Sequence, residues 1–222
     1  MSKRPKDDSP GQGSGDIPHL ALTHGHALWL LGELGLRGDV ALSTFNSYIK
    51  SLRKLGIPFA NDGRRADRRR HVVYDFEALM ELSVALLLRV YGTLPDEIAA
   101  GLRDFRDDLR PIYRQAYLDT LGGLRPPARI STPGGARFLI GGLFLDLNVR
   151  YAAGRMLDFG PPRAISPFDA IRVYALSEGA ARSYLPLNVT AVARKIVERS
   201  RVLPPMRRTH GAHAPIRPRY GR

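Results

Sequence analysis

The stretch that decides the fold reads STFNSYIKSLRKL, from Ser43 to Leu55. Its apolar residues recur at spacings of four, three and three, as one face of a helix does: Phe45, Ile49, Leu52 and Leu55. Polar and basic residues fall on another face: Ser43, Ser47, Lys50 and Lys54. The segment therefore predicts an amphipathic helix that has Ser43 as its N-cap and ends at Gly56 and Pro58. A solvated surface helix without a partner has the same pattern.

A second stretch follows and reads GRRADRRRH, from Gly63 to His71. It holds five arginines within seven residues, offset only by Asp67: Arg64, Arg65, Arg68, Arg69 and Arg70. Because such a density of like charge repels itself, it favours contact with a polyanion over a merely solvated basic loop. Apolar residues are scarce from Pro58 until the β-prone run His71–Tyr74. We therefore expect a short hairpin with the arginines near its tip.

Helical patterns flank these two stretches. Residues 1–20 are rich in Gly, Ser, Pro and charge, which predicts a disordered arm. An apolar pattern then predicts a helix from His26 to Gly35. On the other side, Asp75 is a suitable N-cap for a helix that extends to Val90. Because that helix is apolar on most sides, we expect it to be buried and central.

The second half of the chain is less regular. Pro95 opens a helix that Pro111 is expected to interrupt, and a further helix follows over Ile112–Leu121. We expect a Gly/Pro-rich loop over residues 122–137, two short strands or a hairpin over residues 138–149, and a helix that begins with Ser166 as its cap. A last helix is expected over residues 188–200, and residues 206–222 are expected to form a basic disordered tail that can touch phosphate.

Composition limits the class of protein. The chain has 222 residues, 44% of them hydrophobic, and a formal net charge of +13, which favours polyanionic partners. It has no cysteine, so disulfides, cysteine-ligated zinc and thiol chemistry are excluded. We find no signal peptide and no run of about 18 apolar residues that could span a membrane. We therefore expect a cytoplasmic protein associated with the nucleoid.

Three partial motifs resemble the winged helix-turn-helix domain of the MerR family: Leu31-Gly32-Glu33-Leu34 with Val40, Thr44-Phe45 and Tyr48; Arg69 to Leu79; and Tyr91 to Ile98. The resemblance covers roughly residues 27–105. It implies that the helix from Ser43 is a recognition helix and that the arginine-rich stretch is a wing. Family members dimerise through a long coiled coil, whereas Pro111 interrupts the corresponding segment of this chain.

A recognition helix would place its first residues near the base edges of the major groove. There Asn46 could pair with adenine and Lys50 could reach the acceptors of guanine. The resemblance gives Tyr48 a backbone contact, although a core aromatic is an equal reading of that residue. The complete set of expected DNA-binding residues is Ser43, Thr44, Asn46, Ser47, Tyr48, Lys50, Arg53, Lys54, Arg64, Arg65, Arg68, Arg69, Arg70 and His71.

Enzymatic chemistry has little support in the sequence. His24 and His26 are two residues apart, a spacing that does not align metal ligands on a helix. The glycine pair Gly141-Gly142 is not followed by the Gly-Lys-Ser/Thr of a phosphate loop. We therefore expect no catalytic residues, no cofactor and no metal.

Together these patterns predict a mainly α protein. A MerR-like winged helix-turn-helix domain would occupy residues 21–108, and a small α+β domain for dimerisation, effector or partner binding would occupy residues 109–205. The expected function is sequence-specific binding of double-stranded DNA by a homodimeric bacterial transcriptional regulator. Two alternatives stay open. One is an architectural or packaging DNA-binding protein of phage or plasmid type, and the other is an activator that acts mainly through a partner such as RNA polymerase.

Overall fold

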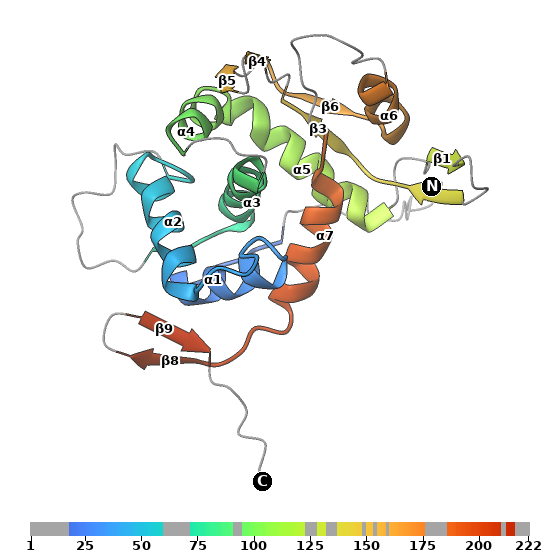
Figure 1. Ribbon diagram of the computed structural model, residues 1–222. Helices are drawn as coiled ribbons and strands as arrows, with labels where there is room; N and C mark the ends of the chain where they lie inside the picture. Colours follow the sequence, from blue (N-terminus) through green and yellow to red (C-terminus); the bar gives the residue numbers. More distant parts are fainter. Residues whose placement is uncertain are drawn as a thin grey trace, which may run out of the picture.

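The computed structural model describes residues 18–59, 72–90, 95–122, 128–131, 137–147, 150–152, 155–158, 160–175, 186–209 and 212–215. The fold is mainly α (Figure 1). Its helices are α1 (His24–Glu33), α2 (Leu42–Lys54), α3 (Phe76–Val90), α4 (Pro95–Asp104), α5 (Arg106–Gly122), α6 (Pro167–Ala175) and α7 (Val189–Ser200). Its strands are β1 (Ala128–Ser131), β2 (Arg137–Ile140), β3 (Phe144–Asp146), β4 (Arg150–Ala152), β5 (Arg155–Asp158), β6 (Arg163–Ile165), β7 (Leu187–Asn188), β8 (Met206–Thr209) and β9 (Ala212–Pro215).

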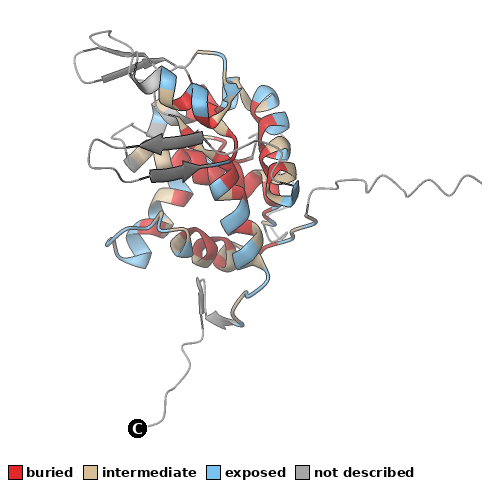
Figure 2. Cartoon of the chain, turned by 90° about the vertical axis from the view of Figure 1, so that its right-hand side faces the viewer, coloured by how far each residue is buried: buried red, intermediate tan, exposed pale blue. Residues whose placement is uncertain are grey.

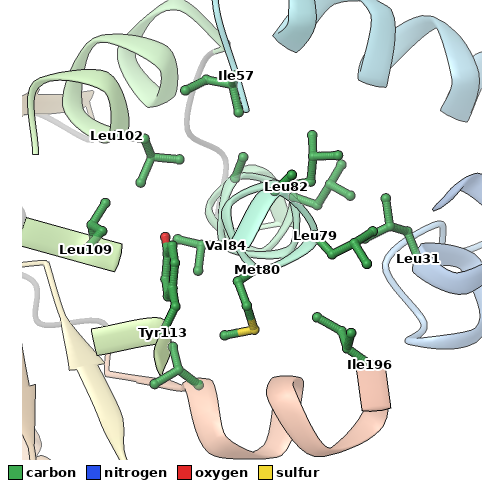
Figure 3. Packing of buried hydrophobic residues seen from close by; sticks show 14 of the residues in the cluster. Leu31, Ile57, Leu79, Met80, Leu82, Val84, Leu102, Leu109, Tyr113 and Ile196 are labelled. Carbon is green, nitrogen blue, oxygen red and sulfur yellow. The ribbon is translucent and has the colours of Figure 1, made fainter. Parts of the chain in front are cut away.

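Helix α3 forms the centre of the molecule, as its apolar sequence predicts. Its side chains Leu79, Met80 and Leu82 are fully buried. Residues from the surrounding elements point toward α3, among them Leu31 of α1, Tyr113 of α5 and Ile196 of α7 (Figure 3). Because α3 is hydrophobic on most sides, its apolar side chains are all shielded from water only when other helices cover it on most sides.

Side-chain caps fix the starts of several helices where the sequence indicated them. The Ala78 amide donates to Asp75 Oδ1 at 2.8 Å, which confirms Asp75 as the cap of α3. The Asp169 amide donates to Ser166 Oγ at 3.1 Å, and the Ala191 amide donates to Asn188 Oδ1 at 2.9 Å. These bonds satisfy amide groups that a helix leaves unpaired in its first turn.

Two expected helix starts are wrong. Helix α2 begins at Leu42 with Ala41 as its N-cap, so Ser43 already lies inside the helix and cannot cap it. The amide of Phe45 bonds to the Ala41 carbonyl at 3.0 Å, which closes the first turn two residues earlier than expected. Helix α1 likewise begins at His24, because Thr23 Oγ1 accepts from the His26 amide.

The expected interruption at Pro111 is also wrong, since Pro111 lies inside α5. The break between α4 and α5 occurs earlier, at Phe105, whose carbonyl accepts from the amide of Leu109 at 2.9 Å. Pro111 is exposed, and its neighbours Leu109 and Ile112 are buried in the core. Packing on both sides therefore holds the helix together across the one missing amide.

The strands form several small antiparallel sheets. Strand β3 lies between β6 and β7, while β2 pairs with β1. The two expected strands over residues 138–149 are thus confirmed, but the hairpin is wrong because each strand pairs elsewhere. Strand β1 falls inside residues 122–137, which were expected to be a loop.

The expected disordered tail is corrected in part. Strands β8 and β9 pair with Met206 opposite Pro215 and Thr209 opposite Ala212, and β9 packs against α1. In this arrangement the backbone groups of β8 and β9 bond to each other and β9 has α1 as a packing partner, whereas a free tail would have neither. The remaining residues, 210–211 and 216–222, lie outside the described part of the chain.

A hydrophobic cluster extends from Leu22 to Ile196, and buried residues fill the interior of the molecule (Figure 2). Helix α7 packs against α5, α3 and α1, so it belongs to the same core as the N-terminal helices. The predicted domain boundary between residues 108 and 109 falls inside α5. Helix α2 therefore packs on the surface of a single hydrophobic core to which both halves of the chain contribute.

Candidate nucleic-acid interface

Helix α2 has one buried face and one exposed face. Phe45, Ile49 and Leu52 are buried against the core, as their spacing predicted. The opposite face is exposed and consists of Ser43, Thr44, Ser47, Lys50, Ser51 and Lys54. We call these six residues the α2 face. Helix α2 contains no acidic residue, so no side chain of the helix itself neutralises its lysines.

Short polar groups are turned back onto the helix along this face. Ser47 Oγ donates to the Ser43 carbonyl at 3.0 Å, and Ser51 Oγ donates to the Ser47 carbonyl at 3.0 Å. Each hydroxyl oxygen keeps lone pairs that can accept from a ligand. Among the described residues, neither Lys50 nor Lys54 takes part in an ion pair. The α2 face therefore presents two uncompensated cations between small hydroxyl groups.

Asn46 lies beside this face, and its amide oxygen is already bonded. His24 Nε2 lies 2.9 Å from Asn46 Oδ1, and His24 Nδ1 lies 2.9 Å from the hydroxyl of Tyr74. A neutral histidine with its proton on Nε2 satisfies both contacts, because it donates to Asn46 and accepts from Tyr74. The amide oxygen keeps a second lone pair, so a two-bond contact of Asn46 with adenine would share this oxygen with His24.

Arg53 is half-buried and turned toward the same cluster. Burial raises the pKa of Tyr74, and the charge and hydrogen bond of Arg53 oppose that rise. Arg53 therefore lies beside the Tyr74 oxygen rather than standing free in solvent as a phosphate contact would. The sequence did not reveal this cluster, since His24 and Tyr74 are fifty residues apart.

Tyr48 anchors α2 to α3. The guanidinium carbon of Arg89 lies 3.0 Å from the centroid of the Tyr48 ring, and the ring packs against the hydrophobic cluster. A cation stacked on an aromatic face stabilises such a contact by about 0.5–1 kcal/mol at an exposed site. This placement matches the core-aromatic reading of Tyr48, and one face of its ring is covered.

The carboxyl end of α2 is fixed by a long-range hydrogen bond. Gly56 has a φ of +91°, which a residue with a side chain rarely adopts, and this turn ends the helix. Its carbonyl accepts from Arg106 Nη2 at 2.6 Å, while the Ile57 amide donates to the Leu52 carbonyl at 2.9 Å. Arg106 thereby ties the end of α2 to α5.

The arginine-rich stretch, with Arg64, Arg65, Arg68, Arg69, Arg70 and His71, lies outside the described residues. The two ends from which it departs are described and lie together, because the rings of Phe59 and Tyr74 are 5.4 Å apart. Tyr74 also exchanges two backbone hydrogen bonds with Leu22, at 2.9 and 2.8 Å. The described residues on the two sides of the stretch are therefore in contact with each other.

Comparisons with known proteins give no relative: no family model, no curated protein and no solved structure matches the chain. No helix among the described residues is long and apolar enough to cross a membrane. The described residues also contain no group of three or more His, Asp or Glu side chains that could hold a metal ion. The geometry of α2 is thus the main guide to function.

Proposed function

We propose that this protein binds double-stranded DNA through the α2 face. The observation that carries the proposal is the asymmetry of α2, whose apolar face is locked into the core while its exposed face holds Lys50 and Lys54 without an acid. A rigid helix that offers small polar groups and cations suits the major groove, which admits one α-helix. Phosphate contacts by lysine would set the register, and the hydroxyl groups would face the base edges.

The surroundings of α2 support the same partner. The chain carries a net charge of +13, and five arginines lie between α2 and α3 in the sequence, in a stretch whose flanking residues Phe59 and Tyr74 are in contact. If five phosphates were neutralised there, the logarithm of the affinity would fall with the logarithm of salt concentration with a slope on the order of −4 to −5. We propose that this stretch acts as a wing beside a recognition helix.

We propose further that the protein is a homodimeric bacterial transcriptional regulator with a MerR-like winged helix-turn-helix. The order of elements supports this reading, since α1, a turn, α2, the arginine-rich stretch and α3 follow one another. Site-specific recognition is favoured over architectural binding because the α2 face combines hydroxyl groups with cations, whereas a phosphate-binding surface needs cations alone.

The test is a selection of bound fragments from sheared bacterial DNA at about 150 mM salt, a physiological ionic strength. The full chain is compared with the variant Lys50→Ala/Lys54→Ala. The control is Arg172→Ala, which removes an exposed cation from α6 on the opposite side of the molecule from α2 (Figure 1).

Enrichment of one inverted or repeated motif, lost in the α2 variant and kept in the control, supports a dimeric site-specific regulator. Equal recovery of all fragments would instead favour an architectural DNA-binding protein. If no fragment is recovered, the proposal fails, and a protein partner such as RNA polymerase becomes the next candidate.

A further inference from the structure

A groove of about 520 Å³ opens along α3, facing α4 and α5. The residues that follow α2, Pro58 and Phe59, close one end of it. This volume lies within the range of about 300–1,000 Å³ that is typical of small-molecule sites. The groove is separate from the α2 face, because none of the six residues of that face lines it.

The walls of the groove carry opposite charge. Helix α3 and its cap contribute Asp75, Glu77 and Glu81, whereas the facing wall contributes Arg103, Arg106 and Arg110. Asp107 is the one acid on the basic wall, and its side chain is almost wholly exposed. A ligand that carried only negative charge would meet the carboxylates of α3, and a ligand that carried only positive charge would meet the arginines.

Ion pairs hold the inner and outer acids of α3 and leave Arg103 as the most weakly paired arginine of the groove. Arg106 Nη2 lies 2.7 Å from Glu81 Oε1, with both side chains nearly buried. Farther out, Glu77 pairs with Arg114 at 2.7 Å and with Arg110 at 3.4 Å, and Arg103 Nε lies 4.0 Å from Asp104 Oδ1. Because Arg103 is more than half exposed and its ion pair is long, it is the cation most available to a ligand.

A buried polar atom of the groove lacks a partner. Tyr113 lines the groove, its side chain is 1% exposed, and its hydroxyl has no hydrogen bond within the described structure. The ring projects from α5 toward α3 (Figure 3). Buried hydroxyl groups are nearly always hydrogen-bonded, and this one is closed off from solvent, so a ligand atom bonds to it only when the groove wall shifts to expose it.

We propose that the groove binds a small zwitterionic molecule of amino acid or dipeptide type that has an apolar side chain. Its carboxylate would lie toward Arg103 and its ammonium group toward the acids of α3. The apolar part would pack against Pro58 and Phe59, and a polar atom of the ligand would bond to the hydroxyl of Tyr113. Charges on opposite walls, an apolar end and an unpaired hydroxyl together match this class of ligand.

The position of the groove links it to α2. Arg106, in its wall, holds the Gly56 carbonyl at the end of α2. Phe59 contacts the ring of Tyr74, which contacts His24, which bonds to Asn46 beside the α2 face. Occupancy of the groove should therefore change the affinity for DNA, and DNA should change the affinity for the ligand by the same factor. This linkage rests on the proposed function, whereas ligand binding itself does not.

The test is a calorimetric titration of the full chain without DNA. Three forms of the dipeptide Phe-Ala serve as matched probes: the zwitterion, the N-acetyl form that keeps only the carboxylate, and the amide that keeps only the ammonium group. We expect saturable binding of the zwitterion, at least tenfold tighter than either blocked form. Equal affinity for all three forms, or no saturable binding of the zwitterion, would overturn the proposal.

Single-residue variants test where the ligand binds and whether each residue contributes to ligand affinity or only to the stability of the fold. Arg103→Ala and Tyr113→Phe should each weaken the zwitterion about tenfold, a change of about 1.4 kcal/mol, while Arg172→Ala should leave the affinity unchanged. Tyr113→Phe keeps the ring, so its melting temperature should not fall; unchanged affinity in a folded Tyr113→Phe variant would contradict the site. A repeat with DNA added tests the linkage, and its failure alone would leave the groove intact while questioning the DNA proposal.

Discussion

The α2 face and the groove along α3 are two charged surfaces with opposite design. Lys50 and Lys54 stand exposed without an acidic neighbour on their helix, whereas Arg106 and Arg110 of the groove form ion pairs with Glu81 and Glu77 of α3. The first arrangement stores electrostatic free energy that a polyanion releases. The second is balanced internally, so it holds helices together and suits a ligand with both charges. The net charge of the protein does not distinguish the two surfaces. They differ in whether each cation has an acidic partner.

The largest expected effect comes from the balanced surface. In Arg106→Ala, Glu81 loses its buried partner and the Gly56 carbonyl loses its donor, so the free energy of unfolding should fall by about 3–5 kcal/mol at pH 8. Urea unfolding followed by circular dichroism measures this change. Arg103→Ala, in the exposed part of the same wall, is the matched control and should change stability by less than about 1 kcal/mol. Similar losses of stability in both variants would show that the buried pair Arg106–Glu81 stabilises the fold no more than an exposed arginine does.

A pH dependence follows from the same carboxyl group. Burial raises the pKa of Glu81 from 4.5 to about 7, and the hydrogen bond and charge of Arg106 oppose that rise. The folded state then binds a proton more tightly than the unfolded state, so this contribution to stability is complete below pH 4.5 and is lost as the pH rises through 7. The loss amounts to about 3 kcal/mol across this range, at 1.36 kcal/mol per pKa unit.

Unfolding free energies measured from pH 4.5 to 8 test this slope, and Glu81→Gln should flatten it. The variant keeps the size of the side chain and cannot titrate. An unchanged slope in Glu81→Gln would assign the pH dependence to other groups.

The exposed surface should respond to salt instead. Removing two phosphate contacts with Lys50→Ala/Lys54→Ala should make the salt slope of DNA affinity shallower by about 2, at 0.9 per contact. Fluorescence anisotropy between 50 and 300 mM salt gives this slope, where the Debye length changes by roughly a factor of two. The Arg172→Ala control should keep the original slope. Parallel slopes for all three proteins would remove α2 from the interface.

The α2 face was largely predictable from the sequence, and its supports were not. The spacing of Phe45, Ile49 and Leu52 fixed which side of α2 is buried, because helical geometry relates residues three and four apart. The bonds from His24 to Asn46 and from Arg106 to Gly56 join residues 22 and 50 positions apart, and no local periodicity encodes them. The groove was missed for the same reason, since its walls come from three helices.

Start positions of helices were less predictable than their faces. The sequence favoured Ser43 as the N-cap of α2, whereas the helix begins two residues earlier, with Ala41 as its N-cap and no side-chain cap. A proline removes an amide donor and therefore predicts a break at Pro111, yet the buried residues on either side hold α5 together. At Pro111, tertiary packing thus outweighed a local preference of about 3 kcal/mol.

The smallest expected effect separates ligand binding from stability at one atom. Tyr113→Phe removes a buried hydroxyl that has no partner within the described structure, so the free energy of unfolding should rise by about 1 kcal/mol without ligand. Tyr74→Phe is the matched control, because it removes a buried hydroxyl that His24 bonds, and stability should fall by about 1 kcal/mol. Opposite signs in thermal unfolding would show that the protein keeps one tyrosine hydroxyl for its own structure and holds the other ready for a ligand. A loss of stability in both variants would mean that Tyr113 has a structural partner, and the case for the groove as a binding site would weaken accordingly.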